Sequence, residues 1–193
     1  IAMDEILPVD PDMLKFYEAL SAQSPPEAAS WPLDVQRSAW NGVCRIFRAP
    51  KPEGISVEDR MLNGVPCQIF CPQGAGLKPG LIYFHGGGWV LGGPDTHGDI
   101  CAEMAAGADC VVVLVDYRLA PEHPHPAQLE DSLAVLSWLR EHGREIGMDP
   151  FNIIGGGDSA GGQMAVSLSL WLRDQGMTAL NGMLLIYPVL GND

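Results

Sequence analysis

The sequence has 193 residues, 47% of them hydrophobic and 18% charged, which suits one folded domain and is too short for two large ones. Its formal net charge of -13 argues against nucleic acid and anionic membrane surfaces, because both require an excess of Lys and Arg. The longest apolar runs, 111–115 and 183–187, are too short to span a bilayer. We therefore expect a globular protein without a nucleic-acid partner or a membrane span.

The five cysteines are an odd number and include no C-x-x-C pair. Cys67 and Cys71 lie in one alternating segment with no His nearby, so no zinc site is expected. Free, buried thiols in a reducing compartment are the default for such a set. The N-terminus also lacks the charged start, apolar stretch and cleavage site of a signal peptide. These features together predict a cytoplasmic protein.

The first 41 residues predict a small helical appendage. Asp10 can cap a helix that begins at Pro11, and the segment 24–26, Ser-Pro-Pro, ends it. Apolar side chains between these points fall on one helix face: Met13, Phe16, Tyr17 and Leu20. We expect residues 1–41 to form one part of the molecule and residues 42–193 to form its core.

The core begins with a pattern that predicts two antiparallel strands. Val43–Arg48 and Val65–Phe70 both alternate apolar and polar side chains. An Asn-Gly pair at 63–64 precedes the second segment, and this pair favours a tight hairpin turn.

Strands and helices then alternate along the chain. Short apolar runs predict strands at 81–84, 111–115, 151–154 and 183–189. Helical patterns occupy the intervals at 99–106, 127–142 and 160–175. Consecutive strand–helix units predict a mostly parallel sheet with helices on both faces, which is an α/β fold.

The segment 157–161 reads GDSAG and fits the G-x-S-x-G pattern of a nucleophile elbow. It follows a predicted strand and precedes a predicted helix, which is the context that this pattern requires. Small neighbours allow a tight turn that holds the Ser159 hydroxyl clear of the sheet, at a helix N-terminus. A plain glycine-rich turn is the alternative, and the strand and helix on either side disfavour it.

The segment 85–89 reads HGGGW and leaves another predicted strand. Its Gly86, Gly87 and Gly88 N–H groups, with that of Ala160, could donate hydrogen bonds to a developing oxyanion. A phosphate-binding loop would need G-x-G-x-x-G or a Gly-Lys-Ser ending, and neither is present. We expect His85 to hold this loop by hydrogen bonds, and residue 89, a tryptophan, to line a substrate pocket.

The segment 116–124 reads DYRLAPEHP and predicts a rigid loop after a strand. We expect Asp116 and Arg118 to pair in a structural network. His123 and His125 lack a third ligand nearby in the sequence, so no metal site is expected there.

The three motifs HGGGW, DYRLAPEHPHPA and GDSAGG, in this order, resemble the hormone-sensitive lipase family of bacterial carboxylesterases. The resemblance implies an α/β-hydrolase fold in which residues 1–41 belong to a cap over the active site. It also implies hydrolysis of short- to medium-chain acyl esters without a cofactor. Ser159 would be the nucleophile, Asp158 its structural neighbour, and Ala160 with two of the three loop glycines would form the oxyanion hole.

The chain departs from that family in the rest of the triad, which follows the serine as an acid and then a histidine. After Ser159 the only acids are Asp174 and Asp193, and the last histidine is His142. The sequence also ends directly after a predicted strand. We therefore expect an N-terminal portion, incomplete at its C-terminus, with the triad Asp and His beyond residue 193.

Two other interpretations remain open. The chain could be a non-catalytic protein that binds a small ligand on the same fold. Alternatively, a homodimer or a second polypeptide could complete the fold and the triad.

Overall fold

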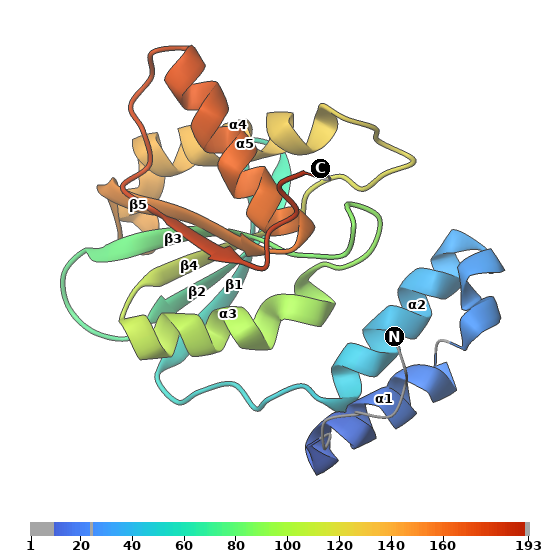
Figure 1. Ribbon diagram of the computed structural model, residues 1–193. Helices are drawn as coiled ribbons and strands as arrows, with labels where there is room; N and C mark the ends of the chain where they lie inside the picture. Colours follow the sequence, from blue (N-terminus) through green and yellow to red (C-terminus); the bar gives the residue numbers. More distant parts are fainter. Residues whose placement is uncertain (1–9, 24, 192–193) are drawn as a thin grey trace. The chain divides into compact units, whose positions relative to one another are not determined.

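The computed structural model describes residues 10–23 and 25–191, and the chain divides into two compact units, 1–48 and 49–193. The first unit is helical, with α1 at Pro11–Gln23, the 3-10 helix η1 at Pro26–Ser30 and α2 at Leu33–Ile46 (Figure 1). Asp10 caps α1 as predicted, since its Oδ1 accepts the Asp12 N–H at 2.8 Å.

The strand predicted at Val43–Arg48 is wrong, because α2 continues to Ile46 and is followed by a turn. Over six residues an alternating pattern does not exclude a helix, and the buried Val43 lies at helical spacing from Trp40 and Phe47. The first strand is instead β1 at Ile55–Leu62. Its interior is exposed and charged because it lies at the edge of the sheet, so the apolar periodicity that predicts strands is weak there.

The second unit contains a six-stranded sheet in the order β1-β2-β4-β3-β5-β6. The further strands are β2 at Val65–Pro72, β3 at Lys78–Phe84, β4 at Val111–Val115, β5 at Met148–Asp158 and β6 at Met183–Ile186. Strands β3 to β6 run parallel, whereas β1 and β2 are antiparallel to their neighbours. The predicted Asn-Gly turn joins β1 to β2, with φ values of 46° at Asn63 and 87° at Gly64.

Helices cover both faces of this sheet, as predicted (Figure 1). They are α3 at Pro94–Ala108, α4 at Ala127–His142 with the short η2 at Gly143–Ile146, and α5 at Ala160–Asp174. The fully buried strand β4 shows why: Val111, Val113 and Val115 face the core under α4 and α5, while Val112 and Leu114 face α3. No helix in the described part of the chain is long and apolar enough to cross a membrane.

Three loops leave the sheet at the carboxyl ends of its central strands, and this arrangement positions the site. The last residue of β3, Phe84, pairs with Val115 of β4 on one side and with Gly157 of β5 on the other. The loops that follow these strands carry the three sequence motifs. Motifs separated by tens of residues therefore meet at the carboxyl ends of the parallel strands, where ligands of open α/β sheets bind.

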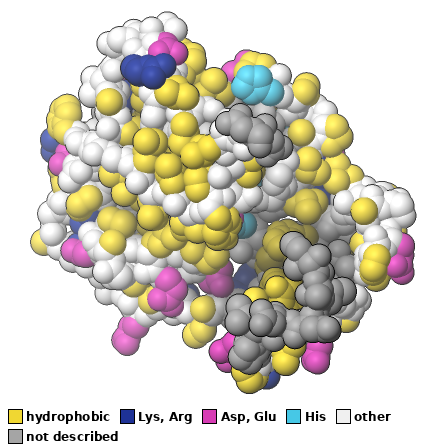
Figure 2. Space-filling model, in the orientation of Figure 1, with side chains coloured by type: hydrophobic (Ala, Val, Ile, Leu, Met, Phe, Trp, Pro, Cys, Tyr) yellow, Lys and Arg dark blue, Asp and Glu magenta, His cyan; other side chains and the backbone are white. Residues whose placement is uncertain are grey.

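Strand β6 has β5 as its one partner strand among the described residues. Exposed hydrophobic side chains lie on this strand and just after it, namely Met183, Leu184, Tyr187, Val189 and Leu190. Figure 2 shows hydrophobic side chains gathered in the middle of the face that carries β6 in Figure 1.

All five cysteines are free, as predicted, but only three of them are buried, and Cys44 and Cys71 are partly exposed. Burial raises the pKa of Cys67 to about 12, with the charges of Asp116 and Asp131 as further causes, so this thiol stays neutral.

Candidate active site

Ser159 occupies a sharp turn between β5 and α5. Its backbone has φ 51° and ψ -115°, a conformation that costs a non-glycine residue about 1–3 kcal/mol. Backbone hydrogen bonds hold it on both sides: its N–H donates to Ile186 O at 2.9 Å, and its carbonyl accepts the Val189 N–H at 3.2 Å. The strained turn places Ser159 at the N-terminus of α5, where negative charge is favoured.

The glycines around Ser159 are needed because backbone segments approach closely. A Cβ on Gly161 would overlap the carbonyl group of Phe84, and one on Gly157 would meet both the Phe84 oxygen and the backbone of Gly161. A Cβ on Gly162 would lie 2.9 Å from the Pro188 side chain. Only glycine allows the first turn of α5 to lie directly against the end of β3.

The glycine loop after β3 has three N–H groups, of which one is hydrogen-bonded to the protein and two are open, that is, without a protein acceptor in the described chain. The Gly86 N–H, predicted as an oxyanion donor, instead donates to Asp158 Oδ1 at 3.0 Å. Gly87 and Gly88 have φ values of 122° and 61°, and within the described chain their N–H groups have no protein acceptor. Gly88 is exposed and has open space around it. With the Ala160 N–H at the start of α5, these two groups can bind a negatively charged oxygen.

Asp158 connects the loop to the elbow through a buried hydrogen-bond network. Besides the Gly86 N–H, its carboxylate accepts the Tyr83 hydroxyl at 2.9 Å and lies 3.3 Å from His97 Nε2. Burial alone would raise the pKa of Asp158, but the interaction with His97 and the hydrogen bonds from Tyr83 and Gly86 lower it overall. The carboxylate is therefore charged and fixes the Gly86 end of the loop.

His97 was missed by the sequence analysis. It lies in the first turns of α3, its Nδ1 is 2.7 Å from Thr96 Oγ1, and its partner Asp158 is 61 residues away in the chain. No local motif marks it, so only the tertiary contact reveals its role.

His85 is fully buried and supports its own loop. Its ring stacks on Tyr117 at 4.2 Å between centroids, its Nδ1 lies 2.8 Å from Gly86 O, and the Tyr117 hydroxyl donates to the His85 carbonyl at 2.7 Å. Burial lowers its pKa from 6.5 to about 4, so the ring is neutral at pH 7. These contacts support a structural role, and the His85 Nε2 is buried without a hydrogen-bond partner in the described part of the chain.

This pKa predicts that the fold loses stability on mild acidification. The unfolded chain binds a proton at His85 near pH 6.5 and the folded chain only near 4, so the stabilisation is complete above 6.5. As the pH falls from 6.5 to 4 the free energy of unfolding should drop by roughly 3 kcal/mol. Urea unfolding at several pH values should show this slope in wild type and in His125→Gln, an exposed control. A slope unchanged in His85→Gln would contradict the assignment.

Arg118 belongs to a structural network, but with a partner other than the predicted Asp116. Its Nε donates to Asp131 Oδ1 at 2.9 Å and its Nη2 donates to Glu130 Oε2 at 3.0 Å, both on α4. Gln128 adds two bonds from its Nε2, to the carbonyls of Arg118 at 2.8 Å and His123 at 2.7 Å. The 116–124 loop is therefore fastened to α4.

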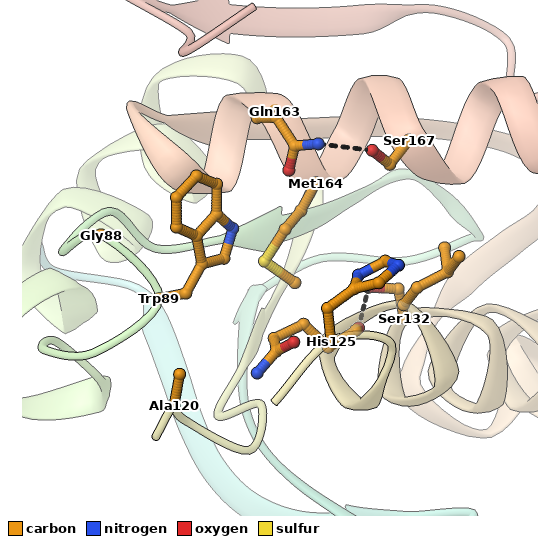
Figure 3. A pocket seen from close by; sticks show the side chains of 10 residues that line it. Gly88, Trp89, Ala120, His125, Ser132, Gln163, Met164 and Ser167 are labelled. Atoms are coloured by element: carbon orange, nitrogen blue, oxygen red, sulfur yellow. Dashed lines mark hydrogen bonds between the residues drawn. The ribbon is translucent and has the colours of Figure 1, made fainter. Parts of the chain in front are cut away.

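A cavity of about 300 Å³ lies beside this site (Figure 3). It is lined by Gly88, Trp89, Ala120, His125, Gln128, Leu129, Ser132, Gln163, Met164 and Ser167. Gly88 carries an open N–H, and the Gln163 backbone N–H donates to the Ser159 carbonyl at 3.2 Å. The cavity therefore adjoins both the glycine loop and the Ser159 turn. Trp89, predicted to line a substrate pocket, forms one wall of it.

The structure thus brings Ser159, Ala160, Asp158 and the 85–89 loop together, but among residues 10–23 and 25–191 no side chain forms a hydrogen bond with the Ser159 hydroxyl. Both buried histidines, His85 and His97, have the other contacts described above. The described residues include no group of three or more His, Cys, Asp or Glu side chains that could hold a metal ion.

Several curated proteins that are similar to this chain are named esterases. The chain is 50% identical over 118 residues to esterase LipI of Mycobacterium tuberculosis, an alignment that spans 61% of this chain and 37% of LipI. It is 45% identical over 128 residues to carboxylesterase NlhH of the same species, spanning 66% of this chain and 40% of NlhH. The chain thus matches well under half the length of these curated relatives.

Solved structures that are similar to this chain include esterases as well. The ester-hydrolase EH1AB1 from the metagenome of Lake Arreo superposes with a TM-score of 0.85 at 34% identity, covering 97% of this chain and 62% of that one. An esterase from the bacterial hormone-sensitive lipase family gives 0.80 at 32% identity, covering 94% and 59%. The family described as alpha/beta hydrolase fold matches residues 81–193. This chain therefore belongs to the α/β-hydrolase fold family, in its hormone-sensitive lipase branch.

Proposed function

We propose that the full-length protein is a serine carboxylesterase with Ser159 as its nucleophile. The observation that carries this proposal is the strained Ser159 turn at the start of α5, beside the open N–H groups of Gly87, Gly88 and Ala160. The esterase relatives support it. The triad acid and histidine are proposed to lie beyond residue 193, because the 34 residues after Ser159 include no histidine.

In the proposed reaction a histidine removes the hydroxyl proton of Ser159, and the oxygen attacks the ester carbonyl. The three N–H groups stabilise the resulting oxyanion, each contributing about 3–4 kcal/mol to barrier lowering in comparable sites. The alcohol leaves, and water then hydrolyses the acyl-enzyme. Asp158 contributes indirectly, because its bond to Gly86 holds the loop that presents the donors.

We further propose short- to medium-chain acyl esters as substrates. The cavity beside Ser159 has about 300 Å³, which lies at the small end of the range for ligand pockets, and its walls are largely apolar. Such a space suits a short aliphatic chain better than a long one.

A series of p-nitrophenyl esters of increasing acyl length, assayed with the full-length polypeptide, tests this function. We expect kcat/KM to peak among the short and medium chains and to fall steeply for palmitate. The change in tryptophan fluorescence that is lost in Trp89→Phe gives a parallel readout of binding at this cavity. Ester binding without product formation would reject the esterase and favour a non-catalytic binding protein.

A further inference from the structure

The cavity beside Ser159 has a polar pair on its α5 wall. Gln163 and Ser167 lie one helical turn apart, and Gln163 Nε2 donates to Ser167 Oγ at 2.7 Å (Figure 3). Apolar parts of the lining come from Trp89, Leu129 and Met164, which offer no strong hydrogen-bonding oxygen. The pair is therefore a polar point in a mostly apolar space.

This pair retains one acceptor and one donor for a ligand. A carboxamide oxygen accepts hydrogen bonds, and a serine hydroxyl that accepts one can still donate its proton. Within the described residues, neither Gln163 Oε1 nor the Ser167 hydroxyl proton has a partner. Figure 3 shows the side-chain oxygen of Gln163 turned toward the space between Trp89 and Met164.

Besides the pair, the cavity lining contains three polar residues: His125, which is exposed, and Gln128 and Ser132, which are already engaged by the protein. Ser132 is fully buried and its Oγ donates to Gln128 O at 2.7 Å. The Nε2 of Gln128 is used by two loop carbonyls, those of Arg118 and His123. The α5 pair is thus better placed than either of these to read a polar group on a ligand.

We propose that Gln163 and Ser167 select esters that carry an aliphatic hydroxyl group in this cavity. A hydroxyl donates to Gln163 Oε1 and accepts from Ser167 Oγ at the same time, so it satisfies both groups. A plain alkyl chain would exclude water from the pair and leave both atoms unsatisfied, which is costly in an apolar pocket. This inference rests on the proposed esterase function, and the hydroxyl can belong to either the acyl or the alcohol part.

The test compares hydroxylated and plain esters on the full-length polypeptide. One arm uses p-nitrophenyl 6-hydroxyhexanoate against hexanoate, and the other uses 6-hydroxyhexyl acetate against hexyl acetate. In one arm, Gln163→Leu should lower the hydroxylated-to-plain ratio of kcat/KM about 10-fold. Gln175→Leu, an exposed glutamine beyond the end of the same helix, should leave the ratio at its wild-type value. The arm that responds identifies the acyl or the alcohol side.

A binding measurement keeps this test independent of catalysis. The dissociation constants of 1,6-hexanediol and 1-hexanol are measured by calorimetry, and Gln163→Leu should lower the relative affinity for the diol about 10-fold. A ratio unchanged by Gln163→Leu in both ester arms and in calorimetry overturns the inference, while plain-ester hydrolysis would leave the esterase function standing. If no ester is hydrolysed, the esterase function fails, and calorimetry alone decides whether the pair reads a hydroxyl.

Discussion

Replacing Ser159 with alanine is expected to lower kcat for ester hydrolysis by about 10⁴- to 10⁶-fold in the full-length polypeptide. The substitution removes the attacking oxygen and leaves the Gly87, Gly88 and Ala160 N–H groups in place. The free energy of unfolding should stay close to that of wild type, because alanine keeps the same backbone and makes no new contact. Steady-state kinetics with a p-nitrophenyl ester and urea unfolding measure the two effects separately.

A matched variant, Ser159→Gly, should be equally inactive but more stable than Ser159→Ala. The backbone at this position has φ 51° and ψ -115°, which glycine adopts without strain, so about 1 kcal/mol of stability should be gained. Residual activity near the wild-type level in either variant would show that another residue attacks the ester.

Replacing Gly161 with alanine is expected to destabilise the fold by about 3 kcal/mol or more. The new Cβ would overlap the backbone carbonyl of Phe84. Because the overlapped atoms belong to the backbone, no side chain can move aside to relieve the contact. Either β3 or the start of α5 must shift, and the shift would also displace Ser159. We expect a lower urea midpoint together with a loss of ester hydrolysis.

Gly107→Ala is the matched control for this substitution. Gly107 is exposed within α3, and a Cβ there would meet no atom within 4 Å. Alanine should stabilise the helix by about 1 kcal/mol, because it loses less conformational freedom than glycine on folding. If Gly161→Ala were as stable as Gly107→Ala, the close approach of α5 to β3 could not be the reason for the glycine.

The elements with strong local signals were predictable from the sequence. The fully apolar run Val111–Val115 and the helix at Ala127–His142 have the predicted bounds. The elbow and the glycine loop were recognisable because their chemistry depends on neighbours in the chain. The sequence also predicted that the elbow and the glycine loop lie close together, since parallel strands place their carboxyl ends at the same end of the sheet.

Features that depend on distant partners were not predictable in the same way. The charged edge strand β1 lacks a clear apolar period, and the alternation at 43–48 predicted a strand where α2 in fact continues to Ile46. Three side-chain partners of this kind became visible only in the folded chain: Gly86 with Asp158, His97 with Asp158, and Arg118 with Asp131. Each pair joins residues 13 to 72 positions apart, beyond the range of any helix or turn pattern.

The most direct test of the central claim is the site of covalent labelling by a serine-reactive organophosphonate. Intact-mass and peptide mass spectrometry should find one adduct per full-length polypeptide, on Ser159, and none on Ser159→Ala. Ester hydrolysis should fall in proportion to the labelled fraction. An adduct on another residue, or hydrolysis that persists after complete labelling of Ser159, would contradict the assignment of Ser159 as the nucleophile.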